Sequence, residues 1–550
     1  MKTIRLTMSQ ALVRAMVAQK TMIDGRVEPF FPGVWAIFGH GNVAGLGEAL
    51  HERRDELPVF RGHNEQGMAL AATAFAKAAR RRQAMAVTSS IGPGALNMVT
   101  AAGVAHVNRL PLLLLPGDVF ASRIPDPVLQ QIENFGDGTL SANDALRPVS
   151  RYFDRITRPE QLIPAFQQAM RILTDPADCG PVTLSLCQDT QAEAFDYPES
   201  FFATRIHRIR RTAPDPSELE EAIALIKAAK KPVIIAGGGV LYSGAEADLA
   251  AFCTEKGIPA GETQAGRSSL ATSHPMNMGG IGVSGSAAAN AVVAEADLII
   301  ATGTRLQDFT TGSWGLFRNP DVRILALNVQ SFDAAKHAAF PLVVDARTAL
   351  SALSAGLEGW RAEASWTDRA ARERAEWLRV SAECQAAPSA TQAGLPTDAQ
   401  VIGAVQRAAR PTDTVVCAAG GLPAELQKHW HAEQPGGYHM EYGFSCMGYE
   451  LAGALGVKLA CPEREVIVML GDGSFLMLNA EIATSVMLGQ KLIIVLLDNH
   501  GYACINRLQN ATGGESFNNL WKDCRQDVFP EIDFVQIARA GRAGREGRVG

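Results

Sequence analysis

The sequence has 550 residues, of which 47% are hydrophobic and 20% charged, a balance typical of soluble globular proteins. At about 150 residues per domain, this length indicates three or four domains, and three is our working number. The net charge of −6 comes without a long basic run, so the sequence offers no source for the salt-sensitive phosphate contacts of nucleic-acid binders. We therefore expect no nucleic acid as partner.

The first twenty residues, MKTIRLTMSQALVRAMVAQK, have helical spacing and lack the continuous apolar stretch of a signal peptide, so we expect them to belong to the fold. The apolar run LPLLLLP at 110–116 is too short to cross a bilayer and predicts a buried strand. Nine scattered cysteines without a C-x-x-C pair favour reduced, mostly buried thiols. These features predict a cytoplasmic protein with no membrane partner.

Apolar strand-like runs alternate with helical patterns along the whole chain. This alternation predicts parallel sheets covered by helices, an α/β architecture of doubly wound domains. The runs are Met85–Thr88, Leu112–Leu115, Val182–Leu186, Val233–Ala236, Leu298–Ala301, Ile324–Asn328, Val466–Leu470 and Leu492–Leu497.

Two stretches have the composition of linkers, at about 189–216 and 385–396, the second after a charged helical segment at 366–383. We expect a first domain at 1–190, a central domain at 215–355, a linker region at 356–398 and a last domain at 399–550. The first and last units each place a glycine-rich turn after a strand, which indicates similar folds.

The segment MLGDGSF at 469–475 places a single acid in a glycine turn at the end of a strand. A helical stretch at 476–488 and a second strand follow, and that strand ends in Asp498 and Asn499. A right-handed crossover brings both strand ends to one sheet edge, so Asp472 and Asn499, 27 residues apart, can face each other. A carboxylate beside a phosphate-binding turn is repelled by phosphate unless a divalent cation such as Mg²⁺ lies between them. An isolated GDG turn is a metal site in roughly one case in ten.

The complete pattern, from strand through GDGS and helix to a second strand ending in DN, resembles the thiamine diphosphate (ThDP) enzymes. The resemblance implies three doubly wound domains, with ThDP and Mg²⁺ as cofactors. It implies that Asp472, Asn499 and the carbonyl of Gly501 hold Mg²⁺. It also places Gly471, Gly473, Ser474 and Tyr502 against the cofactor.

Two segments of the first unit resemble the part of these enzymes that holds the aminopyrimidine ring. RGHNEQG at 61–67 places Glu65 at a helix start, where it would hydrogen-bond the ring and so promote the nucleophilic form of the cofactor. Taken alone, a carboxylate at a helix start is about four times more often there because the helix dipole favours it than because it binds a cofactor. The segment SSIGPGALN at 89–97 favours the cofactor role of Glu65 instead, because it resembles the family's GPG loop with Ser90, Gly92 and Asn97.

A third element, SCMGY at 445–449, resembles the position where a large apolar side chain bends ThDP, and Met447 is the candidate. A methionine at a loop–helix junction is otherwise ordinary core. In the central unit, KPVIIAGGG at 231–239 is only a weak nucleotide signal, and a structural role of the glycines is the better interpretation. Some relatives bind FAD there, which we do not carry over.

Histidines are candidates for proton transfer near neutral pH. His40, in the loop FGHGNVAG, and His63, beside Glu65, are catalytic candidates, although a structural role is as frequent for each. His429, His431 and His439 are expected at the surface.

Longer stretches, among them FFPGVWAIFGHGNVAGLGEAL, PLLLLPGDVFASR and EYGFSCMGYELAGALGVKLA, resemble one family of inositol-catabolic hydrolases that open the ring of a cyclic diketone. The resemblance covers residues 1 to about 535 and implies 5-deoxy-glucuronate as the product. The alternatives are a 2-oxo-acid carboligase or decarboxylase similar to acetolactate synthase, or an inactive ThDP-fold protein. Product analysis separates the first two.

The end of the sequence, AGRAGREGRVG, departs from the family, and we expect a last domain that is cut short, with reduced stability. Ala503 replaces a frequent glycine near the metal carbonyl, which we expect to have a minor effect. Because Glu65 and Asp472 lie in different units, the resemblance implies a homodimer or homotetramer with sites between subunits. The sequence does not identify the residues that bind the substrate ring.

Overall fold

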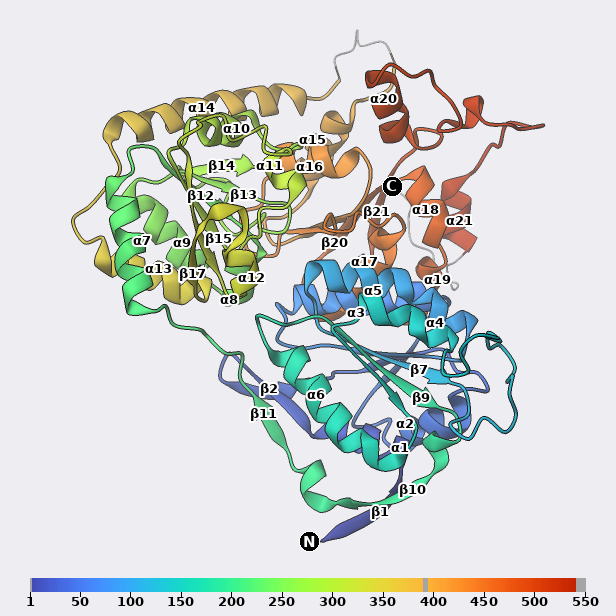
Figure 1. Ribbon diagram of the computed structural model, residues 1–550. Coiled ribbons are helices and arrows are strands. Elements are labelled where there is room, and N and C mark those ends of the chain that lie inside the picture. Colours follow the sequence, from blue (N-terminus) through green and yellow to red (C-terminus); the bar gives the residue numbers. More distant parts are fainter. Residues whose placement is uncertain (1, 389–393, 541–550) are drawn as a thin grey trace.

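The computed structural model describes residues 2–388 and 394–540, which form three α/β domains (Figure 1). The N-terminal domain is built on a six-stranded parallel sheet, the lower domain in Figure 1. In spatial order its strands are β5 (Val59–Arg61), β4 (Val34–Ala36), β6 (Ala86–Ser89), β7 (Leu112–Asp118), β9 (Pro181–Cys187) and β8 (Tyr152–Ile156). Its helices are α1 (Met8–Ala18), α2 (Glu48–Glu52), α3 (Glu65–Ala78), α4 (Pro93–Asn97), α5 (Val99–Asn108) and α6 (Leu162–Thr174). Strand β7 is buried along its whole length, which confirms the buried strand expected at 110–116.

The first expected linker belongs in large part to this domain. Its strand β10 (Ala194–Pro198) pairs with β1 (Thr3–Thr7), and β11 (Arg205–His207) pairs with β2 (Gln19–Ile23), which also pairs with β3 (Arg26–Pro29). Backbone pairing therefore fixes the chain as far as residue 207.

The central domain has a second six-stranded parallel sheet. In spatial order its strands are β14 (Asn277–Gly280), β13 (Ala260–Glu262), β12 (Pro232–Ala236), β15 (Leu298–Thr302), β16 (Arg323–Asn328) and β17 (Phe340–Val343). Its helices are α7 (Pro216–Ala228), α8 (Gly238–Ser243), α9 (Glu246–Lys256), α10 (Ala287–Glu295), α11 (Asp308–Thr311), α12 (Ser331–Ala334) and α13 (Ala346–Gly356). The glycine turn after β12 has a structural role, because a Cβ on Gly239 would lie 2.6 Å from the Cα of Gly303 on the neighbouring turn.

The charged segment expected as a linker is the 21-residue helix α14 (Ala364–Cys384), which packs on the central domain. Trp366, Ala370 and Trp377 of this helix are buried in the central core. The indole N–H of Trp366 donates to the carbonyl of Pro232, at 2.9 Å. The helix therefore completes the domain, and residues 389–393 of the second expected linker lie outside the described residues.

The C-terminal domain has a four-stranded parallel sheet in the order β19 (Tyr438–Met440), β18 (Thr414–Cys417), β20 (Val466–Gly471), β21 (Ile493–Leu497). Counting from the first sheet strand of each domain, the N-terminal and C-terminal sheets share the order 2-1-3-4, in agreement with the expected similarity of the two units. The helices are α15 (Asp398–Ala408), α16 (Leu422–His429), α17 (Tyr449–Ala460), α18 (Asp472–Leu478), α19 (Glu481–Met487), α20 (Ala503–Ala511) and α21 (Phe534–Ala540). The single helix expected at 476–488 is thus two helices with a break at 479–480, and residues 541–550 lie outside the described residues.

The N-terminal and C-terminal domains share one hydrophobic core. Helices α3 and α5 of the first domain and α17 of the last lie together between the two sheets (Figure 1). The helices α3 and α17 approach so closely that a Cβ on Gly456 would lie 2.0 Å from the carbonyl oxygen of Ala71. Glycine is therefore required at this crossing.

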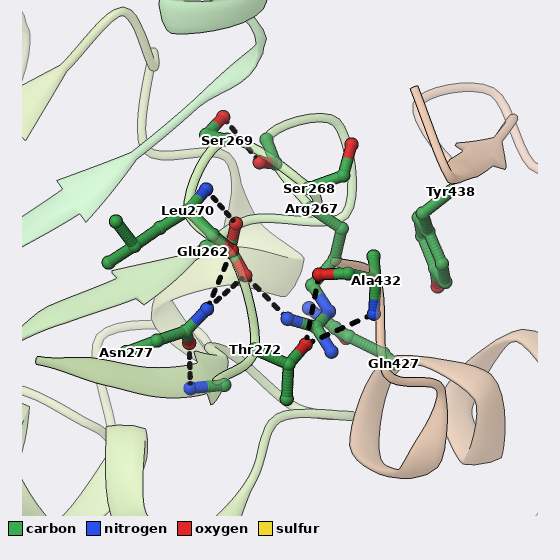
Figure 2. A network of polar contacts seen from close by, with 12 residues as sticks. Glu262, Arg267, Ser268, Ser269, Leu270, Thr272, Asn277, Gln427, Ala432 and Tyr438 are labelled. Carbon is green, nitrogen blue, oxygen red and sulfur yellow. Dashed lines mark hydrogen bonds and ion pairs between the residues drawn. The ribbon is translucent and has the colours of Figure 1, made fainter. Parts of the chain in front are cut away.

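A buried polar network joins the central and C-terminal domains (Figure 2). Arg267 and Glu262 form an ion pair with both side chains fully buried. Arg267 also donates to the carbonyl of Trp430, at 2.7 Å, and Glu262 accepts from the N–H of Leu270, at 3.0 Å. Each buried charge thus has an opposite charge and further hydrogen bonds, the condition under which burial of ions is tolerated.

All nine cysteines are free and five are buried, which confirms the expected reduced thiols. Within the described ranges, helices long and apolar enough to span a membrane are absent.

Candidate active site

Three of the expected site segments meet at the carboxyl edge of the N-terminal sheet. Strands β5, β4 and β6 are neighbours and parallel. Glu65 follows β5, His40 follows β4, and Ser90 follows β6. The topology therefore gathers segments that are 25 to 50 residues apart at the edge where open α/β sheets bind ligands.

Glu65 is the first residue of α3. Asn64 caps this helix by accepting from the N–H groups of Gln66, at 2.8 Å, and Gly67, at 3.3 Å. The half-buried Glu65 carboxylate accepts from the side-chain amide of Asn97, at 3.0 Å. A Cβ on Gly94 would lie 3.0 Å from the other carboxylate oxygen, so this glycine leaves room for the acid. The structure thus brings Glu65 and Asn97 together.

Ser90 and Gly92 form the turn that packs beside this acid. The Oγ of Ser90 is buried and has no hydrogen-bond partner among the described residues. Gly92 has a φ of +64°, and a Cβ there would lie 1.6 Å from the carbonyl oxygen of Gln130. No other residue type fits at position 92.

The two candidate histidines have different surroundings. The Nε2 of His40 lies 3.1 Å from the carbonyl oxygen of Leu129, which it can reach as a donor. The Nδ1 of His63 lies 2.9 Å from the hydroxyl of Thr484, so its ring is tied to helix α19 of the C-terminal domain. His63 is exposed and His40 half-buried, and both lie on segments that border the Glu65 edge.

Asp472 and Asn499 meet at the carboxyl edge of the C-terminal sheet, because β20 and β21 are adjacent with Gly471 beside Leu497. The buried Asp472 carboxylate accepts from the backbone N–H of Asn499, at 3.2 Å, and of Gly501, at 2.8 Å. Burial raises the pKa of Asp472, while these two N–H donors act to lower it. A carboxylate that is held in place and shielded from water is well suited to bind a cation at this position.

The 501–502 segment closes over the glycine turn. A Cβ on Gly473 would lie 2.6 Å from the ring of Tyr502 and 3.4 Å from the carbonyl oxygen of Gly501. Gly501 has a φ of +135°, and a Cβ there would lie 2.4 Å from the carbonyl oxygen of Asn519. Glycine is therefore required at position 501, Gly473 leaves room for the Tyr502 ring, and the Gly501 carbonyl lies beside the Asp472 turn.

Ser474 is engaged within the protein. Its hydroxyl accepts from the N–H of Gly448, at 2.8 Å, and donates to the carboxylate of Glu450, at 2.6 Å. This bond places the half-buried Met447, the residue before Gly448, next to the start of α18. Glu450 is fully buried, and burial raises its pKa to about 7. The sequence analysis missed Glu450, although a lone acid in the apolar stretch MGYELAGALG was an available signal.

A second buried acid lies between the N-terminal and C-terminal domains. Glu481, the first residue of α19, faces α3, since a Cβ on Gly67 would lie 2.1 Å from its Oε1. Burial raises the pKa of Glu481 to about 7. The sequence analysis missed this residue too, because only the packing of α19 on α3 brings it near the Glu65 segment.

Within one chain most of the site residues lie at two different sheet edges. One group contains Glu65, Asn97, Ser90, Gly92 and His40 at the N-terminal sheet edge. The other group contains Met447, 471–474 and 499–502 at the C-terminal sheet edge. In the described ranges, hydrogen bonds or ion pairs between these two groups are absent.

The expectation of surface histidines in the last domain was wrong for two of the three. His429 is buried with its Nδ1 2.8 Å from the Oγ of Ser381 on α14. His439 is buried with its Nε2 2.7 Å from the Tyr449 hydroxyl, and burial keeps its pKa well below the usual value. His431 is half-buried.

Comparison with known protein families gives each domain a counterpart. Residues 33–137 match the thiamine pyrophosphate enzyme N-terminal TPP binding domain, residues 219–353 the central domain, and residues 402–549 the C-terminal TPP binding domain. Three domains of these kinds in this order define a thiamine pyrophosphate (ThDP) enzyme.

The similar curated proteins are more specific. The chain is 49% identical over 564 residues to the 3D-(3,5/4)-trihydroxycyclohexane-1,2-dione hydrolase of Geobacillus thermodenitrificans (strain NG80-2), covering 98% of this chain and 88% of the relative. It is 47% identical over 549 residues to the proteins of the same name from Bacillus cereus (strain AH820) and Bacillus anthracis (strain A0248), covering 96% of this chain and 85% of each relative. The chain belongs to the family of these hydrolases.

Proposed function

We propose that this protein is a ThDP- and Mg²⁺-dependent hydrolase that opens the ring of 3D-(3,5/4)-trihydroxycyclohexane-1,2-dione to 5-deoxy-glucuronate, in the cytoplasmic breakdown of inositol. The observation that carries the proposal is the 47–49% identity to hydrolases of this name over 96–98% of the chain. The net reaction adds water across the bond between the two carbonyl carbons. One carbon becomes a carboxylate and the other an aldehyde.

The C-terminal sheet edge fits a magnesium ion and a diphosphate. Mg²⁺ prefers oxygen ligands, and the Asp472 carboxylate, the Asn499 amide and the Gly501 carbonyl supply three from one turn and its neighbouring loop. A buried carboxylate with a raised pKa gains most from a cation, because the cation compensates its desolvation. Gly471 and Gly473 allow close approach of phosphate, and Tyr502 covers the turn.

When bound, ThDP supplies the carbon nucleophile and electron sink of the reaction. We assign Glu65 to hold a proton at a nitrogen of the aminopyrimidine ring, with Asn97 fixing its carboxylate through the 3.0 Å bond. Ser90 and Gly92 shape the turn beside Glu65, and Met447 would contact the rings of the cofactor.

Two proton-transfer roles remain for side chains. The aldehyde carbon must receive a proton, and the attacking water must lose one. His40 lies at the same sheet edge as Glu65, and His63 is held by Thr484 on the next segment. We assign these steps to His40 and His63, because an imidazole ring can both accept and donate a proton.

The decisive experiment is product analysis with the purified chain, ThDP and Mg²⁺. We expect the cyclic dione to be consumed and 5-deoxy-glucuronate to accumulate, as followed by NMR. Glu65→Gln should lower kcat by at least about a hundredfold, the typical contribution of an acid–base group, and EDTA with dialysis should abolish turnover. Conversion of pyruvate to acetolactate, with the dione untouched, would favour the carboligase instead.

We also propose that each complete site forms between two subunits of a homodimer or homotetramer. The Glu65 group and the Asp472 group lie at different sheet edges of one chain, without hydrogen bonds or ion pairs between them in the described residues, and this supports the proposal. Co-expression of Glu65→Gln chains with Asp472→Ala chains tests it, because a mixed dimer would contain one site with both residues intact. Random pairing should restore about a quarter of the wild-type activity, while each variant alone stays inactive. No recovery in isolated mixed dimers would mean that one chain supplies both residues.

A further inference from the structure

The loop at 441–448, which carries Met447, connects β19 to α17. Two of its residues have left-handed backbone conformations, Ser445 with a φ of +54° and Gly448 with a φ of +84°. Glycine tolerates this conformation, but a serine adopts it only where the surrounding contacts hold it there. The shape of the loop therefore depends on the groups that bind its backbone.

Glu441, the first residue of this loop, is such a group. It is buried, with only 2% of its surface exposed. One carboxylate oxygen accepts from the N–H of Phe444, at 2.9 Å, and the other accepts from the N–H of Cys446, at 2.8 Å. These two N–H groups lie on either side of Ser445, so the carboxylate holds the loop in its left-handed turn. A side-chain amide could not do the same, because it has only one acceptor oxygen.

The N-terminal domain contacts the same acid. The side-chain amide of Asn108, the last residue of α5, donates to it at 2.9 Å. A Cβ on Gly443 would lie 2.5 Å from the amide oxygen of Asn108, so the loop packs directly against this residue. The half-buried Lys77 of α3 donates to the carbonyl of Met440, the residue before Glu441. Burial lowers the pKa of Lys77 to about 8, while Glu441 acts to raise it. A nearby cation and three donors thus favour the charge of Glu441.

The other end of the loop is held by the glycine turn of the C-terminal sheet edge. The N–H of Gly448 donates to the hydroxyl of Ser474, at 2.8 Å. Met447 lies between this bond and the bond from Cys446 to Glu441. Its backbone therefore has a fixed neighbour on each side, which restricts the directions open to its half-buried side chain.

From these contacts we infer that Glu441 is a positioning residue of the ThDP site. It holds the 441–448 loop in the shape that presents Met447 to the rings of the cofactor, and Asn108 and Lys77 keep this acid in place. Because Met447 is taken as a contact of the cofactor, this role rests on the proposed function. It makes the arrangement of the C-terminal site dependent on α3 and α5 of the N-terminal domain. Loss of the Glu441 contacts should then disturb the cofactor geometry without removing a group that touches ThDP.

Hydrogen–deuterium exchange of the ThDP-free protein, read by mass spectrometry, measures whether Glu441 holds the loop. In Glu441→Gln the peptide that spans 441–448 should exchange at least about tenfold faster than in the wild type, because one of the two N–H groups loses its acceptor. Glu463→Gln changes an exposed acid beyond the other end of α17 and is the matched control. This control should exchange like the wild type.

The second measurement is the rate at which the thiazolium C–H of bound ThDP exchanges with solvent deuterium, followed by NMR at saturating ThDP and Mg²⁺. We expect Glu441→Gln and Met447→Ala each to lower this rate by about tenfold or more, since small displacements of reacting groups have effects of this order. The double variant should stay within about threefold of Met447→Ala, because both changes act through the same side chain. A merely structural loss would instead add to the effect of Met447→Ala.

Circular dichroism and gel filtration show which variants fold. If Glu441→Gln does not fold, Asn108→Ala, which removes one donor to the same carboxylate, takes its place in both measurements. Wild-type exchange of the loop or of the thiazolium in the folded variant would overturn the inference, and so would a double variant more than about threefold slower than Met447→Ala. Neither measurement contains the dione. A wild type that leaves the dione untouched, while both rates change as expected in the variants, would therefore refute the proposed substrate and support the role of Glu441.

Discussion

Replacing Glu450 by glutamine should make the protein more stable at alkaline pH and leave its stability unchanged at acid pH. Glu450 is fully buried, accepts from Ser474 and from the N–H of Ala419, at 3.3 Å, and forms no ion pair with a cation of the described chain. Burial raises its pKa from 4.5 to about 7. Glutamine has nearly the same shape and cannot ionise, so the exchange isolates the charge.

The size and sign of the effect follow from proton linkage. Between the unfolded pKa of 4.5 and the folded pKa of about 7, the folded state of Glu450 binds more protons than the unfolded state. The stability contributed by the neutral acid is therefore fully present below about pH 4.5 and is lost as the pH rises toward 7. The loss amounts to about 3 kcal/mol at most, from about 2.5 pH units at 1.36 kcal/mol each. For a domain of this size, that corresponds to roughly 5–10 °C in the melting midpoint.

Thermal melts of wild type and Glu450→Gln between pH 5 and 8.5, with circular dichroism as the readout, measure this difference. We expect the midpoint of the variant to exceed that of the wild type by several degrees at pH 8.5 and by little at pH 5. Glu358→Gln, at an exposed position, should follow the wild type throughout. A midpoint difference that does not change with pH would refute the assignment of a neutral Glu450.

Three further outcomes are expected. Arg267→Met should destabilise the protein by about 3–5 kcal/mol in denaturant melts, because it leaves the charge of Glu262 buried without its partner. Adding Glu262→Gln to this variant should regain part of the loss. An Arg267→Met protein as stable as the wild type would contradict this reasoning. Gly456→Ala should cost about 2–3 kcal/mol, since its Cβ would meet the rigid carbonyl of Ala71, and an unchanged melt would show that the two helices can separate freely. Asp472→Asn should weaken Mg²⁺-dependent ThDP binding by roughly a hundredfold, measured by equilibrium dialysis, and unaltered binding would exclude Asp472 as a ligand.

The positions that the sequence analysis predicted best depend on short-range geometry. Asp472 and Asn499 are brought together by two adjacent parallel strands and one crossover, and a crossover of this kind has a fixed hand. Glu65 and Asn97 likewise follow β5 and β6, which are separated by a single strand. In both cases the spacing along the chain and the sheet rule together determine the contact.

The positions that the sequence analysis missed depend on packing between distant elements. The charged composition of α14 led to its assignment to a linker region. Only the spacing of Trp366 and Trp377 on one helical face indicated that one side of the helix is buried. Ser381 of the same helix contacts His429, which is 48 residues away in the sequence. This packing buries the polar stretch around Gln427 and His429. Local composition carries no information about such a contact.

The core shared by α3 and α17 has a consequence for how the chain matures. Residues separated by nearly 400 positions, such as Ala71 and Gly456, complete the same apolar interior, while the whole central domain is synthesised between them. The N-terminal domain is therefore synthesised with one apolar face exposed. This face is covered only after the C-terminal domain has been made. During that interval it is a natural client for chaperones, and isolated expression of either end should yield aggregates.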